Sequence, residues 1–274
     1  MTIEKISLIR ENIRSRLVGK TKTIDLVLCA MLCRGHVLIE DVPGAGKTTL
    51  AQTLALSVNC SFRRIQCTPD VMPSDITGFS MPDPSTGQFS FRPGVIFNQV
   101  ILADEVNRTS PKTQSALLEA MQENQVTVDG VSYKVPTPFM VIATQNPVEY
   151  VGTFPLPEAQ LDRFFIRVSL GYPQPEDEVR ILDKHDMRSE TLPVEAVVGV
   201  EDILALQEET DRIHVSPALK RYIAEIVSKS RARKDVLLGI SPRGAIYLMY
   251  AAKASAFMDR RGYATPDDVQ KMAP

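Results

Sequence analysis

Two kinds of hydrophobic pattern alternate along the first two thirds of the chain. Short segments, most of them uninterrupted apolar runs, predict strands of the kind that are buried on both faces of a sheet. These segments are residues 36–39, 100–103, 139–143 and 164–169, and residues 62–67 are predicted as a further strand. Helices are predicted between or before them, over residues 4–17, 23–33, 49–56 and 111–123. Buried strands that alternate with helices favour an α/β fold with a parallel five-stranded sheet that is covered on both sides.

The pattern changes after residues 171–173, Gly-Tyr-Pro, where the strand segments stop. The remaining chain has helical spacing, and Ser-Pro pairs that begin at Ser216 and Ser241 are typical of helix starts. We therefore predict two domains: an α/β core over residues 1–172 and a smaller all-α domain over residues 173–274.

Two segments interrupt the α/β pattern of the core. Residues 69–97 form a long stretch rich in Pro, Asp, Gly and Phe. Residues 124–136 contain an alternating pattern that predicts a β-hairpin with its turn at Asp129-Gly130. Both are expected to be insertions into the sheet-and-helix framework.

Composition narrows the class of protein without naming an activity. The chain has 274 residues, 44% of them hydrophobic and 23% charged, as in an ordinary globular protein. A formal net charge of -2 gives no sign of a nucleic-acid or membrane surface. The longest apolar run, residues 26–33, is too short to span a bilayer, and the charged N-terminal segment lacks a signal-peptide core. We expect no membrane insertion and a cytoplasmic location.

The four cysteines favour a reducing environment, because they form neither a C-x-x-C pair nor a secreted disulfide framework. Cys29, Cys33 and His36 have a spacing that a metal site could use. They lie in an apolar stretch, so we expect them to be buried as small hydrophobic side chains instead.

The most informative segment is a glycine-rich turn between the strand at 36–39 and the helix at 49–56. Strand, turn and helix together form the phosphate-binding P-loop, so the sequence predicts a site for a nucleoside triphosphate. The alternative is a chance match on a surface turn. The predicted nucleotide-binding residues of this segment are Asp41, Val42, Pro43, Gly44, Ala45, Gly46, Lys47, Thr48 and Thr49.

Each residue type in this turn suits phosphate. Glycines allow the backbone to approach the ligand closely, and successive N–H groups at the helix start form a nest for anionic oxygens. Lys47 supplies a charge for the β- and γ-phosphates, and Thr48 supplies a hydroxyl ligand for Mg²⁺. Asp41 replaces the first glycine of the usual pattern, so the carboxylates of Glu40 and Asp41 must turn away from the phosphates.

Polar residues end two of the other predicted strands. Asp104 and Glu105 follow the strand at 100–103, where Asp104 is expected to hold the Mg²⁺ shell and Glu105 to polarise the attacking water. Asn146 follows the strand at 139–143 and could hold the same water without adding charge. The alternatives are a strand that ends in a charged loop and an ordinary Asn-Pro turn.

Taken together, four motifs resemble those of the MoxR-type AAA+ ATPases, within the helix-2-insert clade. The resemblance extends from about Ile13 to Ala273, and acidic residues at positions 40 and 41 are usual in this family. The motifs are residues 40–48 (EDVPGAGKT), 103–108 (ADEVNR), 143–147 (ATQNP) and 156–164 (LPEAQLDRF).

The resemblance also implies roles for residues outside the P-loop. Gly19 and Lys20 would lie near adenine, and Asn146 would be the sensor 1 residue. Arg163 would be an arginine finger that reaches the γ-phosphate in a neighbouring subunit, and Arg243 would be sensor 2 on the lid. The alternatives are a salt bridge from Arg163 to Asp162 or Glu158, and a solvated helix-start arginine at position 243.

The family pattern implies further features of the architecture. Residues 69–97 would be the helix-2 insert and residues 124–136 the pre-sensor-1 hairpin, both facing a pore or a partner. Residues 173–274 would be the lid, which in the family usually continues with one more helix beyond the Ala273-Pro274 end of this sequence. Arg108 could also reach a subunit interface.

The resemblance implies an ATP- and Mg²⁺-dependent ATPase that assembles into a homo-hexameric ring and remodels a protein client. In the family this often means activation of metalloenzyme complexes with a partner that carries a von Willebrand A domain. A nucleic-acid helicase or loader is the first alternative, and the near-neutral charge weighs against it. A non-hydrolysing nucleotide-dependent binding module is the second, and Glu105 weighs against that one.

Overall fold

The computed structural model describes residues 2–41, 44–83, 88–147, 152–186 and 194–273. A five-stranded parallel sheet lies at its centre, as the sequence predicted, with strand order β2-β5-β8-β1-β9. The strands are β1 (Val37–Glu40), β2 (Phe62–Gln66), β5 (Val100–Asp104), β8 (Met140–Gln145) and β9 (Ile166–Val168). β2 therefore lies at one edge beside β5, although it follows β1 in the chain.

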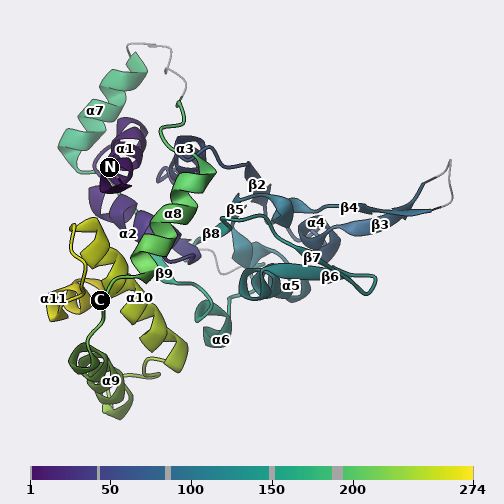
Figure 1. Ribbon diagram of the computed structural model, residues 1–274. Coiled ribbons are helices and arrows are strands. Elements are labelled where there is room, and N and C mark those ends of the chain that lie inside the picture. The colour runs from purple at the N-terminus through teal and green to yellow at the C-terminus, as the bar shows by residue number, and fades with distance from the viewer. Residues whose placement is uncertain (1, 42–43, 84–87, 148–151, 187–193, 274) are drawn as a thin grey trace.

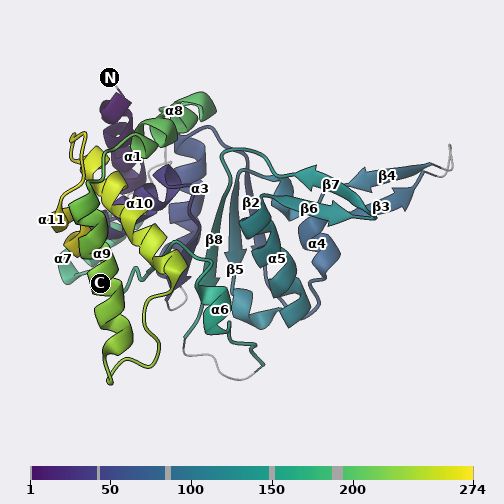
Figure 2. The same cartoon turned by 60° about the horizontal axis from the view of Figure 1, so that its bottom comes forward.

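Alternate residues of the central strands enter two separate cores, one on each face of the sheet. Val37, Leu102 and Ile142 pack on the face that carries the first three helices, while Leu38 and Ile101 pack on the opposite face. Figure 2 shows the sheet between α3 on one side and α5 on the other. The helices are α1 (Thr2–Arg16), α2 (Thr21–Leu32), α3 (Lys47–Ser57) and α5 (Pro111–Glu123). Burial on both faces explains why these strands are continuous apolar runs.

Beyond β9, the described chain has no further strand except an isolated bridge between His214 and Tyr263. Its helices are α7 (Pro175–Asp186), α8 (Val200–Asp211), α9 (Pro217–Ala232), α10 (Pro242–Met258) and α11 (Pro266–Met272). Ser216 and Ser241 cap α9 and α10 as the Ser-Pro pairs predicted, because their hydroxyls accept hydrogen bonds from Leu219 N and Gly244 N.

The C-terminal helices share a hydrophobic core with the N-terminal ones. Helix α2 packs against α8 and α10, and Ile24, Leu206 and Ala252 belong to one buried cluster. The core therefore continues across residue 172, and the division into two domains at that residue stays a prediction.

The insertion at residues 69–97 has regular structure that the sequence did not reveal. It contains a short helix, α4 (Pro73–Thr77), an antiparallel hairpin of β3 (Phe79–Pro82) and β4 (Phe89–Arg92), and a 3₁₀ turn, η1 (Val95–Phe97). The hairpin extends away from the rest of the molecule (Figure 1). Phe79, Met81 and Phe89 on this hairpin are exposed apolar side chains.

A second hairpin, β6 (Gln125–Val128) and β7 (Val131–Lys134), lies beside the first (Figures 1 and 2). Asp129 and Gly130 both have positive φ, which is the backbone of a tight type I′ turn. The ring of Tyr133 stacks on Phe91 of β4, with centroids 3.9 Å apart and planes 11° from parallel. The two insertions therefore contact one another through aromatic side chains.

The four cysteines do not form disulfide bonds. Cys29, Cys60 and Cys67 are buried, Cys33 is half-buried, and all four are free thiols.

Both ring nitrogens of His36 have hydrogen-bond partners, since Nε2 lies 3.0 Å from Met121 O and Nδ1 lies 3.0 Å from Val141 N. Among the described helices, none combines the length and apolar character needed to cross a bilayer.

Candidate functional site

The turn between β1 and α3 has the backbone that a phosphate-binding loop requires. Gly44 and Gly46 have φ of 83° and 91°, a region that side chains with a Cβ rarely adopt. A Cβ on Gly46 would also lie 2.7 Å from Leu17 Cδ1. Both positions therefore favour glycine. Val42 and Pro43, which were also predicted to bind nucleotide, lie outside the described residues.

Helix α3 begins at Lys47, directly after the turn, so its first N–H groups face the space above the loop. Lys47 is buried, and its Nζ donates a hydrogen bond to Asp41 O at 2.9 Å. Thr48 is half-buried and Thr49 is exposed. The helix start thus combines backbone donors, an ammonium group and a hydroxyl in one place.

The two acidic residues before the loop direct their carboxylates elsewhere, as the sequence required. Asp41 Oδ2 accepts hydrogen bonds from Leu170 N at 2.6 Å and Gly171 N at 2.7 Å. Glu40 pairs with Arg167 at 3.2 Å and accepts a hydrogen bond from Gln145. Asp41, which replaces the first glycine of the usual pattern, therefore holds the segment after β9 in position.

Gly19 and Lys20, the predicted adenine-side residues, lie against the same segment. Lys20 Nζ donates to Gly171 O at 3.1 Å and to Tyr172 O at 2.8 Å. Gly19 has a φ of 76°, and a Cβ there would lie 2.0 Å from Asp177 Oδ2. The segment after β9 is thus bound from both sides, its N–H groups by Asp41 and its carbonyls by Lys20.

The carboxyl ends of β5 and β8 meet at Thr144, which joins the two predicted acidic residues. Thr144 Oγ1 donates to Asp104 Oδ1 at 2.6 Å and accepts from Glu105 N at 2.8 Å. Asp104 is buried, and Glu105 has a φ of 58°, in the left-handed region. A strained backbone at a charged residue on a strand end is typical of functional sites.

The side chains of the two acidic residues have basic and amide partners. Arg64 Nη2 lies 2.6 Å from Asp104 Oδ2, while Glu105 Oε2 accepts from Gln66 Nε2 at 2.8 Å and from Arg108 Nη1 at 3.0 Å. Arg108, for which the sequence suggested a subunit interface, therefore contacts Glu105 within the chain.

Sequence reasoning missed Arg64, Gln66 and the role of the Thr144 hydroxyl. The available signal was a pair of long polar side chains two residues apart on the 62–67 strand.

Two asparagines lie near these acidic residues. Asn146, the predicted water-holding amide, is the first residue after β8 and is buried. Asn107 lies in the turn η2 (Val106–Arg108), and its Oδ1 is buried without a hydrogen-bond partner among the described residues. A buried amide oxygen of this kind is a candidate acceptor for a bound water.

Arg163 and Arg243 lie close in the sequence to a contact between the core and the C-terminal helices. Ser241 Oγ donates to Asp162 Oδ1 at 2.6 Å, which joins the residue before Arg163 to the N-cap of the helix that carries Arg243. Within the described chain, neither guanidinium makes an ion pair or a side-chain hydrogen bond. Among the described residues, Arg163 therefore forms neither of the salt bridges considered for it, to Asp162 or to Glu158.

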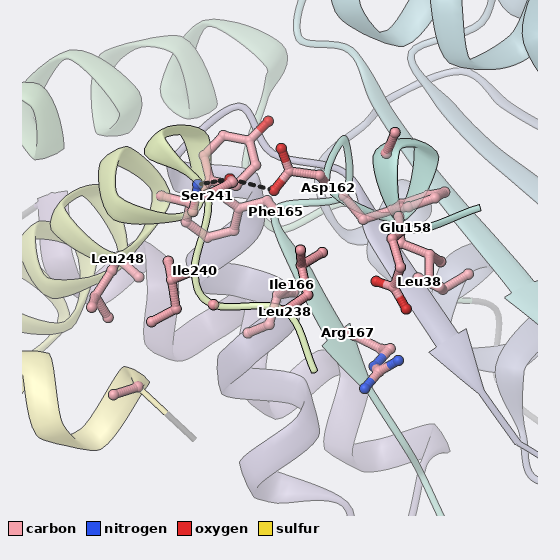
Figure 3. A pocket seen from close by; sticks show the side chains of 18 of the residues that line it. Leu38, Glu158, Asp162, Phe165, Ile166, Arg167, Leu238, Ile240, Ser241 and Leu248 are labelled. Atoms are coloured by element: carbon pink, nitrogen blue, oxygen red, sulfur yellow. Dashed lines mark hydrogen bonds between the residues drawn. The ribbon is translucent and has the colours of Figure 1, made fainter. Parts of the chain in front are cut away.

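A cavity of about 950 Å³ opens beside this contact (Figure 3). It lies between the segment of α6 (Glu158–Leu161) with β9 and the loop before α10. Its apolar lining includes Phe165, Leu238 and Leu248, and none of the described P-loop residues takes part. The cavity is therefore distinct from the predicted phosphate site.

The residues of the P-loop edge fit Mg²⁺ and a triphosphate. The loop has positive φ at Gly44 and Gly46, and the donor groups are a hydroxyl from Thr48 and a carboxylate from Asp104. Mg²⁺ prefers such oxygen ligands. The end of β1 is bonded to β8 through Asp41 N and Gln145 O, at 3.2 Å, and β8 to β5 through Thr144, so loop and acidic residues share one sheet edge.

Comparisons with known proteins agree with this geometry. A family profile described as "ATPase family associated with various cellular activities (AAA)" matches residues 36–166, and one described as "AAA lid domain" matches residues 228–274. Protein YeaC of Bacillus subtilis is 50% identical over 264 residues, covering 96% of this chain and 82% of YeaC. Chaperone MoxR1 of Mycobacterium tuberculosis is 38% identical over 269 residues, covering 94% and 70% of the two chains.

A solved crystal structure of a protein from Cytophaga hutchinsonii has the same fold, with a TM-score of 0.90 at 38% identity. The superposition covers 99% of this chain and 85% of the Cytophaga chain. The strand order, the P-loop and the matched lid define an AAA+ ATPase fold. Within that class, the chain belongs to the MoxR family, as the sequence motifs indicated.

Proposed function

We propose that this protein binds ATP with Mg²⁺ and hydrolyses it to ADP and phosphate. The observation that carries the proposal is the contact of Thr144 with both Asp104 and Glu105, beside a loop with phosphate-binding backbone. Membership of the MoxR family supports nucleotide binding independently of this contact.

The proposed roles follow from the chemistry of each group. The N–H groups at the start of α3 and the ammonium of Lys47 bind the β- and γ-phosphates. Thr48 and Asp104 hold Mg²⁺, which neutralises charge on the phosphate oxygens. Glu105 accepts a proton from the attacking water, and Asn146 orients that water without adding charge. Gly19 and Lys20 support the segment beside adenine.

We further propose that hydrolysis is completed in a ring, with a hexamer as the expected size. Arg163 of one subunit would stabilise charge on the γ-phosphate bound by its neighbour, and Arg243 would act from the lid. Both guanidinium groups lack an ion pair within the described chain, which supports a role toward a ligand or a second subunit. The ring would make hydrolysis depend on assembly.

The output of hydrolysis is proposed to be remodelling of a protein client, as the name Chaperone MoxR1 says of that relative. We expect the client to be a metalloenzyme complex or a partner with a von Willebrand A domain. The exposed Phe79, Met81 and Phe89 on the first insertion support an apolar contact with such a client. We assign this insertion to the helix-2-insert class and the protein to the cytoplasm, which free thiols favour.

Glu105→Gln tests the proposal directly. The amide keeps the size of the side chain and the partners of the backbone but cannot accept a proton from water, so ATP should still bind while turnover falls below about 1%. Nucleotide affinity by fluorescence titration and phosphate release measure the two parts. Normal turnover in this variant would remove Glu105 from the proposed role, and salt-sensitive DNA binding with DNA-stimulated turnover would favour the helicase alternative.

A further inference from the structure

The edge strand β2 directs two polar side chains toward the acidic residues. Its register pairs Arg64 with Leu102 and Gln66 with Asp104 of β5. Paired residues in adjacent strands point to the same face, so Arg64, Gln66 and Asp104 share the face that carries α3. Because β2 is the edge strand of the sheet in the part of the chain that the structure describes, a long side chain can reach along this face to the strand end.

Arg64 makes a close ion pair with the predicted metal ligand. Its Nη2 lies 2.6 Å from Asp104 Oδ2 and 2.9 Å from Gln66 Oε1. Asp104 Oδ1 is already bonded to Thr144, so the guanidinium contacts the other oxygen. The Asp104 side chain is 11% exposed and that of Arg64 is 46% exposed. The pair thus joins a nearly buried carboxylate to a cation that can move into solvent.

The contacts continue from Arg64 to the second acidic residue. Gln66 accepts from Arg64 through Oε1 and donates through Nε2 to Glu105 Oε2 at 2.8 Å. Asp104, Arg64, Gln66 and Glu105 therefore form one chain of hydrogen bonds. Any cation that takes Asp104 Oδ2 must displace Arg64 or share the oxygen with it, and Gln66 then loses a partner while it holds Glu105.

We propose that Arg64 is a built-in counter-cation that competes with the divalent metal ion for Asp104. It is a positioning residue: it contacts Asp104 and sets the metal concentration at which the nucleotide site fills. Gln66 links this exchange to Glu105. The inference rests on the proposed Mg²⁺-ATP site and adds a determinant of its metal dependence.

Binding of Mn²⁺ tests the competition without any measurement of turnover. The probe is the concentration of free Mn²⁺, followed by electron paramagnetic resonance, with the full chain and a non-hydrolysable ATP analogue. Arg64→Met keeps an apolar stem and removes the charge, so it should lower the apparent Kd for Mn²⁺ about two- to five-fold, as expected for a partly exposed charged pair. Arg64→Gln should shift it in the same direction, whereas Arg64→Lys should bind Mn²⁺ as the wild type does.

Arg63 provides the matched control, since it is an exposed arginine on the opposite face of the same strand. Arg63→Met should leave Mn²⁺ affinity unchanged. Equal or weaker Mn²⁺ binding in both neutral Arg64 variants would overturn the inference. Failure of the wild-type protein to bind the analogue at any Mn²⁺ concentration would instead contradict the proposed nucleotide site, and both proposals would then fall.

Discussion

At the scale of single residues, Thr144 connects the two acidic residues of the candidate site. One hydroxyl donates to Asp104 and accepts from the backbone of Glu105, so it fixes a side chain on one strand and a strained peptide beside it. A buried hydrogen bond to a charged group is costly to remove when its partner is left unsatisfied. Asp104 and Glu105 are therefore expected to depend on this threonine for their relative position.

Thr144→Val removes the hydroxyl and nearly preserves the shape. We expect the free energy of unfolding to fall by about 1–3 kcal/mol because Asp104 and Glu105 N lose a buried partner. Turnover should fall about ten-fold or more, because Asp104 and Glu105, the proposed metal ligand and general base, lose their alignment. Urea denaturation and phosphate release measure the two effects, and Thr144→Ser is the control that should restore turnover. Unchanged turnover in the valine variant would contradict the argument.

At the scale of elements, His36 joins three parts of the core. It precedes β1, its Nδ1 accepts from Val141 N in β8, and its Nε2 therefore carries the proton and donates to Met121 O in α5. Burial lowers the pKa of His36 to about 4. The ring is thus a neutral connector whose protonation is opposed by its surroundings.

This pKa predicts a pH dependence of stability with a definite sign. Between pH 6.5 and about 4 the unfolded chain binds a proton at His36 that the native state refuses, so stability is full above pH 6.5 and falls as the pH decreases. The loss should reach about 3 kcal/mol across this window. Urea denaturation at pH 7 and pH 5 should show a smaller difference for His36→Gln than for the wild type. An identical difference in both proteins would exclude His36 as the cause.

At the scale of the whole molecule, the two candidate arginines flank the contact between Asp162 and Ser241. That contact joins the end of α6, which precedes β9, to the start of α10, so a shift of the C-terminal helices would be transmitted to Arg163. If Arg163 acts on the nucleotide of a neighbouring subunit, as we propose, hydrolysis would depend on assembly.

Mixing two inactive variants tests action between subunits. Arg163→Ala and Lys47→Ala should each lose activity, the former by about 10³-fold if its charge is supplied to the transition state. Mixed rings contain some interfaces with an intact Lys47 and an intact Arg163 from its neighbour, so phosphate release should recover in part. Size-exclusion chromatography verifies that mixed rings form. No recovery at any mixing ratio within such rings would place Arg163 within its own subunit's site or outside catalysis.

Local signals were sufficient for much of this molecule. The strand-turn-helix pattern around Lys47, the Ser-Pro helix starts and the buried strands are properties of neighbouring residues, and the structure has each of them. The contact of Arg64 with Asp104 depends on β2 lying beside β5, and strand order cannot be inferred from periodicity. The first insertion was also missed as structure, because four-residue strands with exposed Phe79 and Met81 lack a clear apolar face.

The stacking of Phe91 on Tyr133 has a consequence for how such proteins diversify. These rings belong to different insertions, yet each covers the other. Shortening the first hairpin in a related protein would expose the ring of Tyr133 on the second hairpin. Replacing Tyr133 would remove the ring that packs on Phe91 of the first hairpin. The two hairpins should therefore be inherited, lost and altered together, as a single evolutionary unit carried on two separate stretches of gene.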